Sequence, residues 1–206
     1  MSVCGDAGKS GPPRRLRSDT RRNRRRLLQA VGEVARETPN ELTMQAIATR
    51  AEIGPATAYR YYSTIEDVLA AYSLGVVGEL IEYSEECALK GRLLFEAVLG
   101  KWLELLEEHG AALTQLRSRR GYLERLHAGA DTIVATERAW RRPVSSLLDE
   151  LGLPTDQLEY ALFLSNIIFD PREIGDLRKE AKLSQSEIAA RLTASYIGAL
   201  RGWFQG

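Results

Sequence analysis

The stretch 42-LTMQAIATRAEIGPATAYRYY-62 predicts two short helices joined by a tight turn. Thr43 can cap the first helix, because its hydroxyl can accept a hydrogen bond from a backbone N–H two or three residues later. Apolar residues then recur at helical spacing and form one stripe: Met44, Ile47, Ala48 and Ala51. Gly54 breaks this pattern, and Pro55 suits the first turn of a second helix because its missing N–H would be unbonded there anyway.

The second helix is expected to run from Pro55 to about Tyr62, with Ala58 and Tyr62 on its inner face. Its outer face or flank carries small, hydroxyl and guanidinium side chains: Ala56, Thr57, Tyr59, Arg60 and Tyr61. Such a face can approach a groove closely and donate hydrogen bonds to phosphates and base edges. Two helices joined in this way form a helix-turn-helix, whose second helix lies in the DNA major groove. An ordinary helical hairpin is the alternative.

Residues 42–72 resemble the DNA-binding segment of TetR-type transcriptional regulators. The residues that carry the resemblance are Leu42, Thr43, Ile47, Ala48, Ala51, Thr57, Tyr59, Glu66 and Leu69. The chain departs from the family at Gly54, where a Ser or Thr is usual, and at Ile65, where a Lys is usual. The first change removes a side-chain cap from the second helix, and the second removes a residue that resembles a phosphate clamp.

The resemblance also implies which residues touch DNA. Bases would be faced by Gln45, Pro55, Ala56, Thr57 and Arg60, and phosphates would be held by Thr43, Tyr59 and Tyr61. Arg60 is the best candidate for guanine, because a guanidinium can donate to O6 and N7 together. In this family two such heads, one from each subunit of a homodimer, bind a palindromic operator, most often as a repressor that a small molecule releases.

Charge is distributed unevenly although the net charge is zero. Residues 1–65 contain 12 basic and 6 acidic side chains, which leaves 16 basic and 22 acidic side chains for the rest. A basic head on an acidic body fits DNA binding at one end. No apolar run is long enough for a membrane span and no signal peptide is evident, so we expect a cytoplasmic protein.

The chain is expected to be all-α, with a three-helix, homeodomain-like head and a C-terminal helical domain for ligand binding and dimerisation. Residues 1–18 are rich in Gly, Pro, Ser and Arg and predict a disordered basic arm, either a solubilising tail or a source of extra DNA contacts. The DNA-binding domain would span residues 19–65, beginning with a helix over 21–37, and the effector-binding and dimerisation domain would span residues 66–206. A helix over 66–87 would connect the two.

Further helices are expected over 93–108, 111–117, 122–141, 144–151, 155–169 and 184–204, with Pro143, Pro154 and Pro171 as breaks. The stretch 177–192 resembles the start of a second helix-turn-helix, but no glycine turn follows it. Ser184 and Glu187 instead predict a capping box at the start of the last helix.

The last two long helices, 155–169 and 184–204, would pair with their symmetry mates in the dimer that the resemblance implies. Each has one apolar face: Leu158, Ala161, Leu162, Ser165 and Ile168 on the first, and Ile188, Leu192, Ser195, Tyr196, Ala199, Leu200 and Trp203 on the second. Packing within one subunit only is the alternative.

The C-terminal domain has more apolar and aromatic residues than dimerisation requires, and relatives bind small molecules there. Candidate effector-binding residues are Tyr83, Trp102, Leu106, Tyr122, Leu126, Trp140, Phe163 and Asn166. An ordinary packed core is the alternative for each.

Catalysis and cofactors are not indicated. The two histidines, His109 and His127, form no metal-binding pair, and neither a nucleophile turn nor a phosphate-binding glycine loop is present, so no metal or cofactor is expected. The alternative function is a helical small-molecule-binding protein or enzyme with a degenerate DNA-binding head.

Overall fold

The computed structural model describes residues 14–116 and 120–205, and these residues form helices and connecting turns without a β-strand. The helices are α1 (Arg14–Glu37), η1 (Pro39–Glu41), α2 (Met44–Arg50), α3 (Pro55–Tyr61), α4 (Ile65–Glu86), α5 (Gly91–Leu113), α6 (Tyr122–His127), α7 (Asp131–Leu151), α8 (Leu158–Ile168), α9 (Pro171–Lys179) and α10 (Gln185–Gln205). The all-α prediction is confirmed. No helix in the described ranges combines the length and apolar character needed to cross a membrane.

The head consists of α1, α2 and α3, and its helix-turn-helix follows the sequence prediction. Thr43 Oγ1 accepts from the Ala46 amide at 3.1 Å and thereby caps α2. Gly54 precedes α3 without a side-chain cap, and Pro55 takes the first position of that helix. One stripe from each helix forms a separate small core: Leu27, Ala30, Val31, Ala35, Met44, Ile47, Ala48, Ala51, Ile53 and Ala58 are all buried, together with Val68 and Leu69 of α4 and Ala112 of α5.

Helix α1 begins at Arg14, earlier than the predicted start near Arg21. The Gly- and Pro-rich composition that predicted an arm ends at Pro13, and the residues that follow are mostly good helix formers. The part of the predicted arm over 14–18 is therefore helical, and residues 1–13 lie outside the described residues. Farther along, Asp19 and Arg22 add an ion pair at 3.3 Å with helical spacing.

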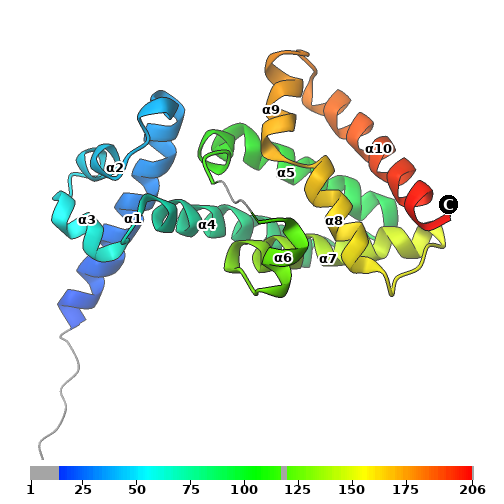
Figure 1. Ribbon diagram of the computed structural model, residues 1–206, viewed down its shortest axis with the longest axis horizontal. Coiled ribbons are helices and arrows are strands. Elements are labelled where there is room, and N and C mark those ends of the chain that lie inside the picture. Colours follow the sequence, from blue (N-terminus) through cyan, green and yellow to red (C-terminus); the bar gives the residue numbers. More distant parts are fainter. Residues whose placement is uncertain (1–13, 117–119, 206) are drawn as a thin grey trace, which may run out of the picture.

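Helix α4 connects the head to the larger body, and Figure 1 shows it running from one into the other. It begins with a capping box: the Thr64 amide donates to Asp67 Oδ2 at 3.0 Å, and the Asp67 amide donates to Thr64 Oγ1 at 3.1 Å. The predicted connecting helix is confirmed. Because α4 packs against α1 in the head and against α5 and α7 in the body, a displacement of this helix would be felt in both.

The body is built around α5, which packs against α4, α7, α9 and α10. Phe95 lies at the centre of its core, with its ring 5.1 Å from the ring of Tyr196, 5.8 Å from Phe169 and 6.0 Å from Trp140. These offset aromatic contacts join α5 to α7, α10 and the end of α8. Trp140 and Phe169 of this cluster also line the cavity described below.

Several helix boundaries in the body differ from the prediction. Helix α5 continues to Leu113, so the separate helix expected over 111–117 is wrong for its described part. The single helix expected over 122–141 is divided into α6 and α7 at Gly129, whose φ of +68° suits glycine. Pro143 lies inside α7 rather than ending it, because packing on both sides of the helix outweighs the one backbone hydrogen bond that proline cannot donate.

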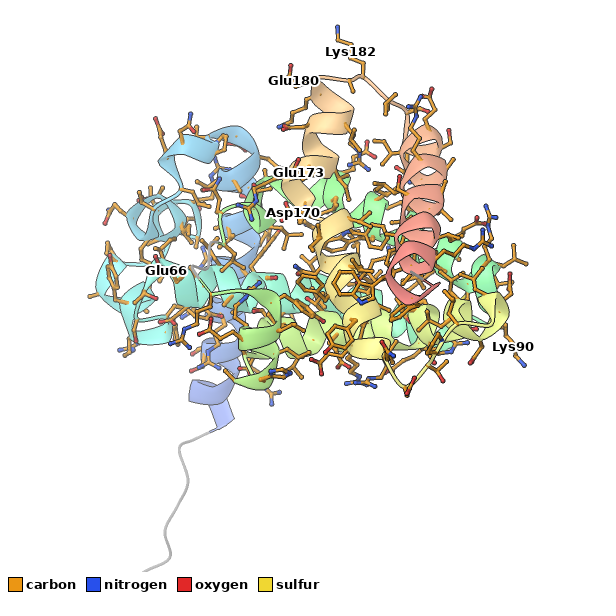
Figure 2. All side chains as sticks on the ribbon, turned by 45° about the vertical axis from the view of Figure 1, so that its right-hand side comes forward. Glu66, Lys90, Asp170, Glu173, Glu180 and Lys182 are labelled. Carbon is orange, nitrogen blue, oxygen red and sulfur yellow. The ribbon has the colours of Figure 1, made fainter. Side chains whose placement is uncertain are left out.

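Helix α9 was not expected, since Pro171 was interpreted as a break. Asp170 instead caps the helix by accepting from the Arg172 amide at 2.8 Å, and Pro171 occupies its first position. Figure 2 places Asp170 and Glu173 near the start of this helix and Lys182 in the turn after it. The capping box of α10 is confirmed: the Ser184 amide donates to Glu187 at 2.9 Å.

The faces predicted for dimerisation on α8 and α10 are largely used inside the subunit. Ala161, Leu162 and Ser165 of α8 are buried, as are Ile188, Leu192, Tyr196 and Leu200 of α10. The assignment of these residues to a dimer face is therefore wrong, because they cover α5 and each other. The opposite sides of the two helices are exposed.

A substitution at Tyr196 can test how strongly the packing of α8 against α10 depends on one hydrogen bond. Its hydroxyl is buried and donates to the Ala161 carbonyl at 2.8 Å, and burial raises the pKa of Tyr196 so that it stays a neutral donor. We expect Tyr196→Phe to lower the free energy of unfolding by about 0.5–1.5 kcal/mol in urea denaturation, the usual net value of one such bond. A loss several times larger would mean that the hydroxyl also positions α8 against α10.

Candidate functional site

The predicted DNA-binding residues lie on the helix-turn-helix at the end of the molecule away from the body (Figure 1). Six of the eight are exposed: Thr43, Gln45, Pro55, Ala56, Tyr59 and Arg60. Thr57 and Tyr61 are half-buried, and Ala58 between them is fully buried against α1 and α2. Helix α3 therefore fixes its inner side in the head core and leaves a face of small and polar side chains open.

Tyr61 connects α3 to α1. Its hydroxyl accepts a hydrogen bond from Asn23 Nδ2 at 3.3 Å, and that bond lowers the pKa of Tyr61. The same tyrosine was predicted to hold a phosphate, and its half-buried position leaves part of the ring open to solvent. Tyr61 thus sets the orientation of α3 against α1, whether or not it also contacts DNA.

Two arginines of the head are held by carboxylates within it. Arg50 pairs with Glu33 at 3.2 Å and with Glu37, whose pKa is lowered chiefly by the hydrogen bond from Arg50, and Arg26 pairs with Glu52 at 2.6 Å. These pairs tie α1 to α2 and to the turn after α2.

Arg60 differs from these two arginines. Its guanidinium lies over the Tyr61 ring at 5.7 Å, and it makes no ion pair with a carboxylate in the described residues. It is therefore the arginine of α2 and α3 whose charge is available to a nucleic acid.

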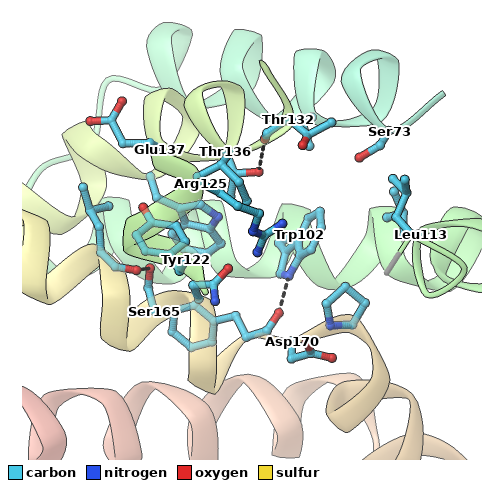
Figure 3. Close-up of a pocket in the computed structure, with 18 of the residues that line it drawn as sticks. Ser73, Trp102, Leu113, Tyr122, Arg125, Thr132, Thr136, Glu137, Ser165 and Asp170 are labelled. Atoms are coloured by element: carbon cyan, nitrogen blue, oxygen red, sulfur yellow. Dashed lines mark hydrogen bonds between the residues drawn. The ribbon is translucent and has the colours of Figure 1, made fainter. Parts of the chain in front are cut away.

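The body contains a cavity of about 360 Å³ between α4, α5, α6, α7 and α8, shown in Figure 3. Its apolar wall includes Val77, Trp102, Ile133, Trp140, Leu162 and Phe169. Its polar lining includes Ser73, Tyr122, Arg125, Thr132, Thr136, Glu137, Ser165, Asn166, Asp170 and Arg172. The lining thus combines aromatic and aliphatic side chains with a similar number of polar ones, and such a pocket can hold a small molecule with both apolar and polar parts.

Four of the eight predicted effector-binding residues line this cavity: Trp102, Tyr122, Trp140 and Asn166. The other four do not. Leu106 and Leu126 belong to the packed core, Tyr83 is exposed on α4, and Phe163 packs toward Trp203 at a ring distance of 6.3 Å on the outer side of α8. Sequence periodicity places a residue on a helix face, but it does not say which stretch of that face borders a void.

Most of the polar lining was missed. Ile133, Thr136, Glu137 and Trp140 recur at helical spacing along α7 and all face the cavity. This stripe mixes hydroxyl, carboxylate and aromatic groups in a helix whose other buried positions are mostly aliphatic. Such a mixed stripe was the one signal in the sequence that could have indicated the site.

The comparison with protein families decides the identity of the head. Residues 27–72 match the family described as bacterial regulatory proteins, tetR family. The head is therefore of the TetR family. The match covers the end of α1, the whole helix-turn-helix and the first third of α4, which are the elements that build the head core.

Solved structures extend the TetR-type fold to the body. The transcriptional regulator FadR from Bacillus subtilis, in complex with stearoyl-CoA, superposes with a TM-score of 0.63 at 18% identity, over 84% of this chain and 96% of that one. A TetR transcriptional regulator from Rhodococcus sp. RHA1 superposes with a TM-score of 0.59 at 19% identity, over 86% of this chain and 95% of that one. The fatty acid degradation regulator FadR from Bacillus halodurans superposes with a TM-score of 0.59 at 18% identity, over 94% of this chain and 99% of that one.

At such identities these structures are informative about fold alone. Among curated protein sequences, none matches the chain. The TetR-family assignment therefore rests on the head, and what the body binds has to be argued from its own residues.

Proposed function

We propose that this TetR-family regulator is a homodimeric repressor that leaves a palindromic operator when a small molecule enters the cavity of its body. The observation that carries the proposal is the pairing of an intact helix-turn-helix, whose recognition face is open, with a cavity lined by Ser73 and Val77 of α4. Because α4 also anchors the head, one helix touches both sites. We place the activity in the cytoplasm, where operator DNA is found.

On DNA, the two α3 helices would occupy successive major grooves, with about 34–36 Å or a multiple of that distance between half-sites. Gln45, Pro55, Ala56, Thr57 and Arg60 would face bases, and Thr43, Tyr59 and Tyr61 would hold phosphates. The exposure of six of these eight residues supports the assignment. The exposed arginines Arg21, Arg22, Arg24 and Arg25 of α1 would add further phosphate contacts.

For the dimer, we infer that the outer sides of α8 and α10 meet their symmetry mates. Large apolar side chains are exposed there, with Tyr160 at 44%, Ile167 at 51% and Trp203 at 51% of their full accessibility. Between them α10 presents small residues at helical spacing, Ala190, Ala194 and Gly198, which would let two helices approach closely. An exposed apolar patch of this kind usually marks an interface.

The path from the cavity to the head would run through Tyr72, the residue of α4 next to Ser73. Tyr72 packs against both cores, and its hydroxyl is hydrogen-bonded to His109 Nδ1 of α5 at 2.8 Å. Gly32 of α1 lies directly against this hydroxyl: a Cβ added there would be 2.6 Å from it. A ligand that moves α4 would therefore move α1, to the extent that it binds the two positions differently.

Gly32→Ala should disturb this path with little loss of stability. Alanine favours a helix interior by about 0.8–1 kcal/mol over glycine, which offsets much of the roughly 1–3 kcal/mol that crowding against Tyr72 costs. We expect operator affinity to fall about 2- to 30-fold in a binding titration, because α1 has to shift. Gly75→Ala in α4 is the matched control, since its added Cβ meets no atom within 4 Å. Equal effects from both substitutions would exclude a special role for the Gly32 contact.

The stearoyl-CoA bound in the Bacillus subtilis FadR structure supports a small-molecule effector in this fold. For the present chain the effector is a proposal that rests on the cavity. The alternative of an enzyme with a degenerate head gains no support from the head, which keeps the Thr43 cap of α2, a packed core and an exposed recognition face.

A footprinting titration on the DNA upstream of the gene that encodes this protein, at two salt concentrations, tests the DNA-binding half of the proposal. We expect a protected site with two-fold symmetry and an affinity that falls steeply with salt, by a slope of about 0.9 per neutralised phosphate on logarithmic axes. Only diffuse binding on this DNA and on a genomic fragment library would contradict sequence-specific regulation.

A further inference from the structure

The two carboxylates that line the cavity each form an ion pair, whereas one arginine of the lining does not. Glu137 forms an ion pair with Arg141, and Asp170 with Arg172 at 3.3 Å, so both acids of the lining already have a cation. The side chain of Arg125 in α6 makes no hydrogen bond or ion pair with any residue in the described part of the chain.

Arg125 is placed to meet something inside the cavity. Figure 3 shows the Arg125 side chain among the other side chains that line the pocket, with Glu137 toward one edge of the view. Its Nε atom is buried and has no acceptor, and burial lowers the pKa of Arg125. A partly desolvated guanidinium without a counter-ion is costly, and an anion that enters the cavity would reduce that cost.

Three uncharged donors in the lining are already engaged. Trp102 Nε1 donates to the Phe169 carbonyl at 3.2 Å, Thr136 Oγ1 to the Thr132 carbonyl at 2.8 Å, and Ser165 Oγ to the Leu162 carbonyl at 2.7 Å. These bonds fix the side chains of Trp102, Thr136 and Ser165 in the lining of the cavity. The cavity therefore offers one unmatched cation beside an apolar wall.

We propose that the cavity binds a small amphipathic oxyanion, with its carboxylate or phosphate head on Arg125 and its apolar part against Trp102, Trp140 and Phe169. The inference rests on the proposed function, since it names the chemical class of the effector. A guanidinium donates two parallel hydrogen bonds to either kind of oxyanion. A volume of about 360 Å³ is near the lower end of the roughly 300–1,000 Å³ usual for ligand pockets, which favours a compact molecule.

Tryptophan fluorescence can measure binding directly. The chain has three tryptophans, and Trp203→Phe would leave only Trp102 and Trp140, both of which line the cavity. The probes are decanoate, decyl phosphate, decanol and decylammonium, which share one chain and differ in the head. We expect both anions to bind about 10- to 150-fold more tightly than decanol, the range of a charged hydrogen-bonded contact, and decylammonium to bind least. The tighter of the two anions identifies the head.

Arg125→Gln in the same background should reduce anion binding by a similar factor and leave decanol within about twofold. Arg125→Lys, which keeps the charge without the planar fork, should be intermediate. Arg120→Gln removes an equal charge from a solvent-exposed side chain that does not line the cavity, and it should change little. Equal binding of all four probes, no binding of any, or anion binding that Arg125→Gln leaves unchanged would overturn the inference.

A footprint repeated with each probe separates this inference from the proposed function. If decanoate binds through Arg125 yet leaves operator protection unchanged, the anion site stands and the effector role fails. If decanol releases the operator as well as decanoate does, the effector role stands and the oxyanion assignment is overturned.

Discussion

Gly198→Arg should convert the proposed dimer to a monomer without unfolding the subunit. Gly198 is exposed on the outer side of α10, and a Cβ there meets no atom of its own subunit within 4 Å. Arginine is also the better helix former by roughly 0.8–1 kcal/mol, so the isolated subunit has no reason to lose stability. Two symmetry-related guanidiniums would, however, hold apart two helices whose close approach depends on small residues.

The expected consequence for DNA is large. A dimer places its second head near the operator at a high effective concentration, which adds about 10²- to 10⁴-fold to the affinity of one head. We expect light scattering to give the monomer mass and operator affinity to fall by that factor.

Gly100→Arg is the control for Gly198→Arg. Gly100 lies on α5, also with open space around an added Cβ and away from the proposed interface. That variant should remain dimeric and bind DNA normally. A dimeric Gly198→Arg protein would show that the subunits meet elsewhere.

Arg60→Ala should remove most of the discrimination between operator and random DNA. A bidentate arginine–guanine contact is worth about 1–3 kcal/mol, and a dimer makes it twice, so the two heads together would lose about 2–6 kcal/mol. The head should stay folded, because Arg60 is exposed and its one close neighbour is the Tyr61 ring.

The control for Arg60 is a lysine. Arg60→Lys keeps the positive charge but cannot donate two parallel hydrogen bonds, so it should retain binding to random DNA and lose part of the operator preference. Competition titrations with operator and random duplexes measure both quantities. If Arg60→Ala weakens binding to both duplexes equally, Arg60 contacts phosphate and another residue reads the bases.

The head was predictable because its determinants are local. The cap at Thr43, the stripe from Met44 to Ala51 and the Gly54-Pro55 turn each act within a few residues, and all three are found as expected. The head core is formed mainly by α1, α2 and α3, which follow one another in the sequence, with added contacts from Val68 and Leu69 of α4 and Ala112 of α5.

The body was less predictable because its boundaries and its cavity depend on distant partners. Pro143 continues a helix that tertiary packing supports, and Gly129 ends one that periodicity would have continued. The proposed role of Arg125 in ligand binding rests on the ion pairs that already engage Glu137 and Asp170, the two carboxylates in the cavity lining. Spacing along the sequence does not show which charged residues of different helices pair in space.

The two hydrophobic cores have few residues in common, and this separation bears on how such a protein could change during evolution. The hydrophobic residues that line the cavity on α6, α7 and α8 belong to the body core, and none of them is part of the head core. Among the described residues, Tyr72 is the one side chain that packs against both cores. Substitutions along those three helices could therefore retune the chemical signal while the operator and its genes stay the same, which also makes this chain a suitable scaffold for sensors of new compounds.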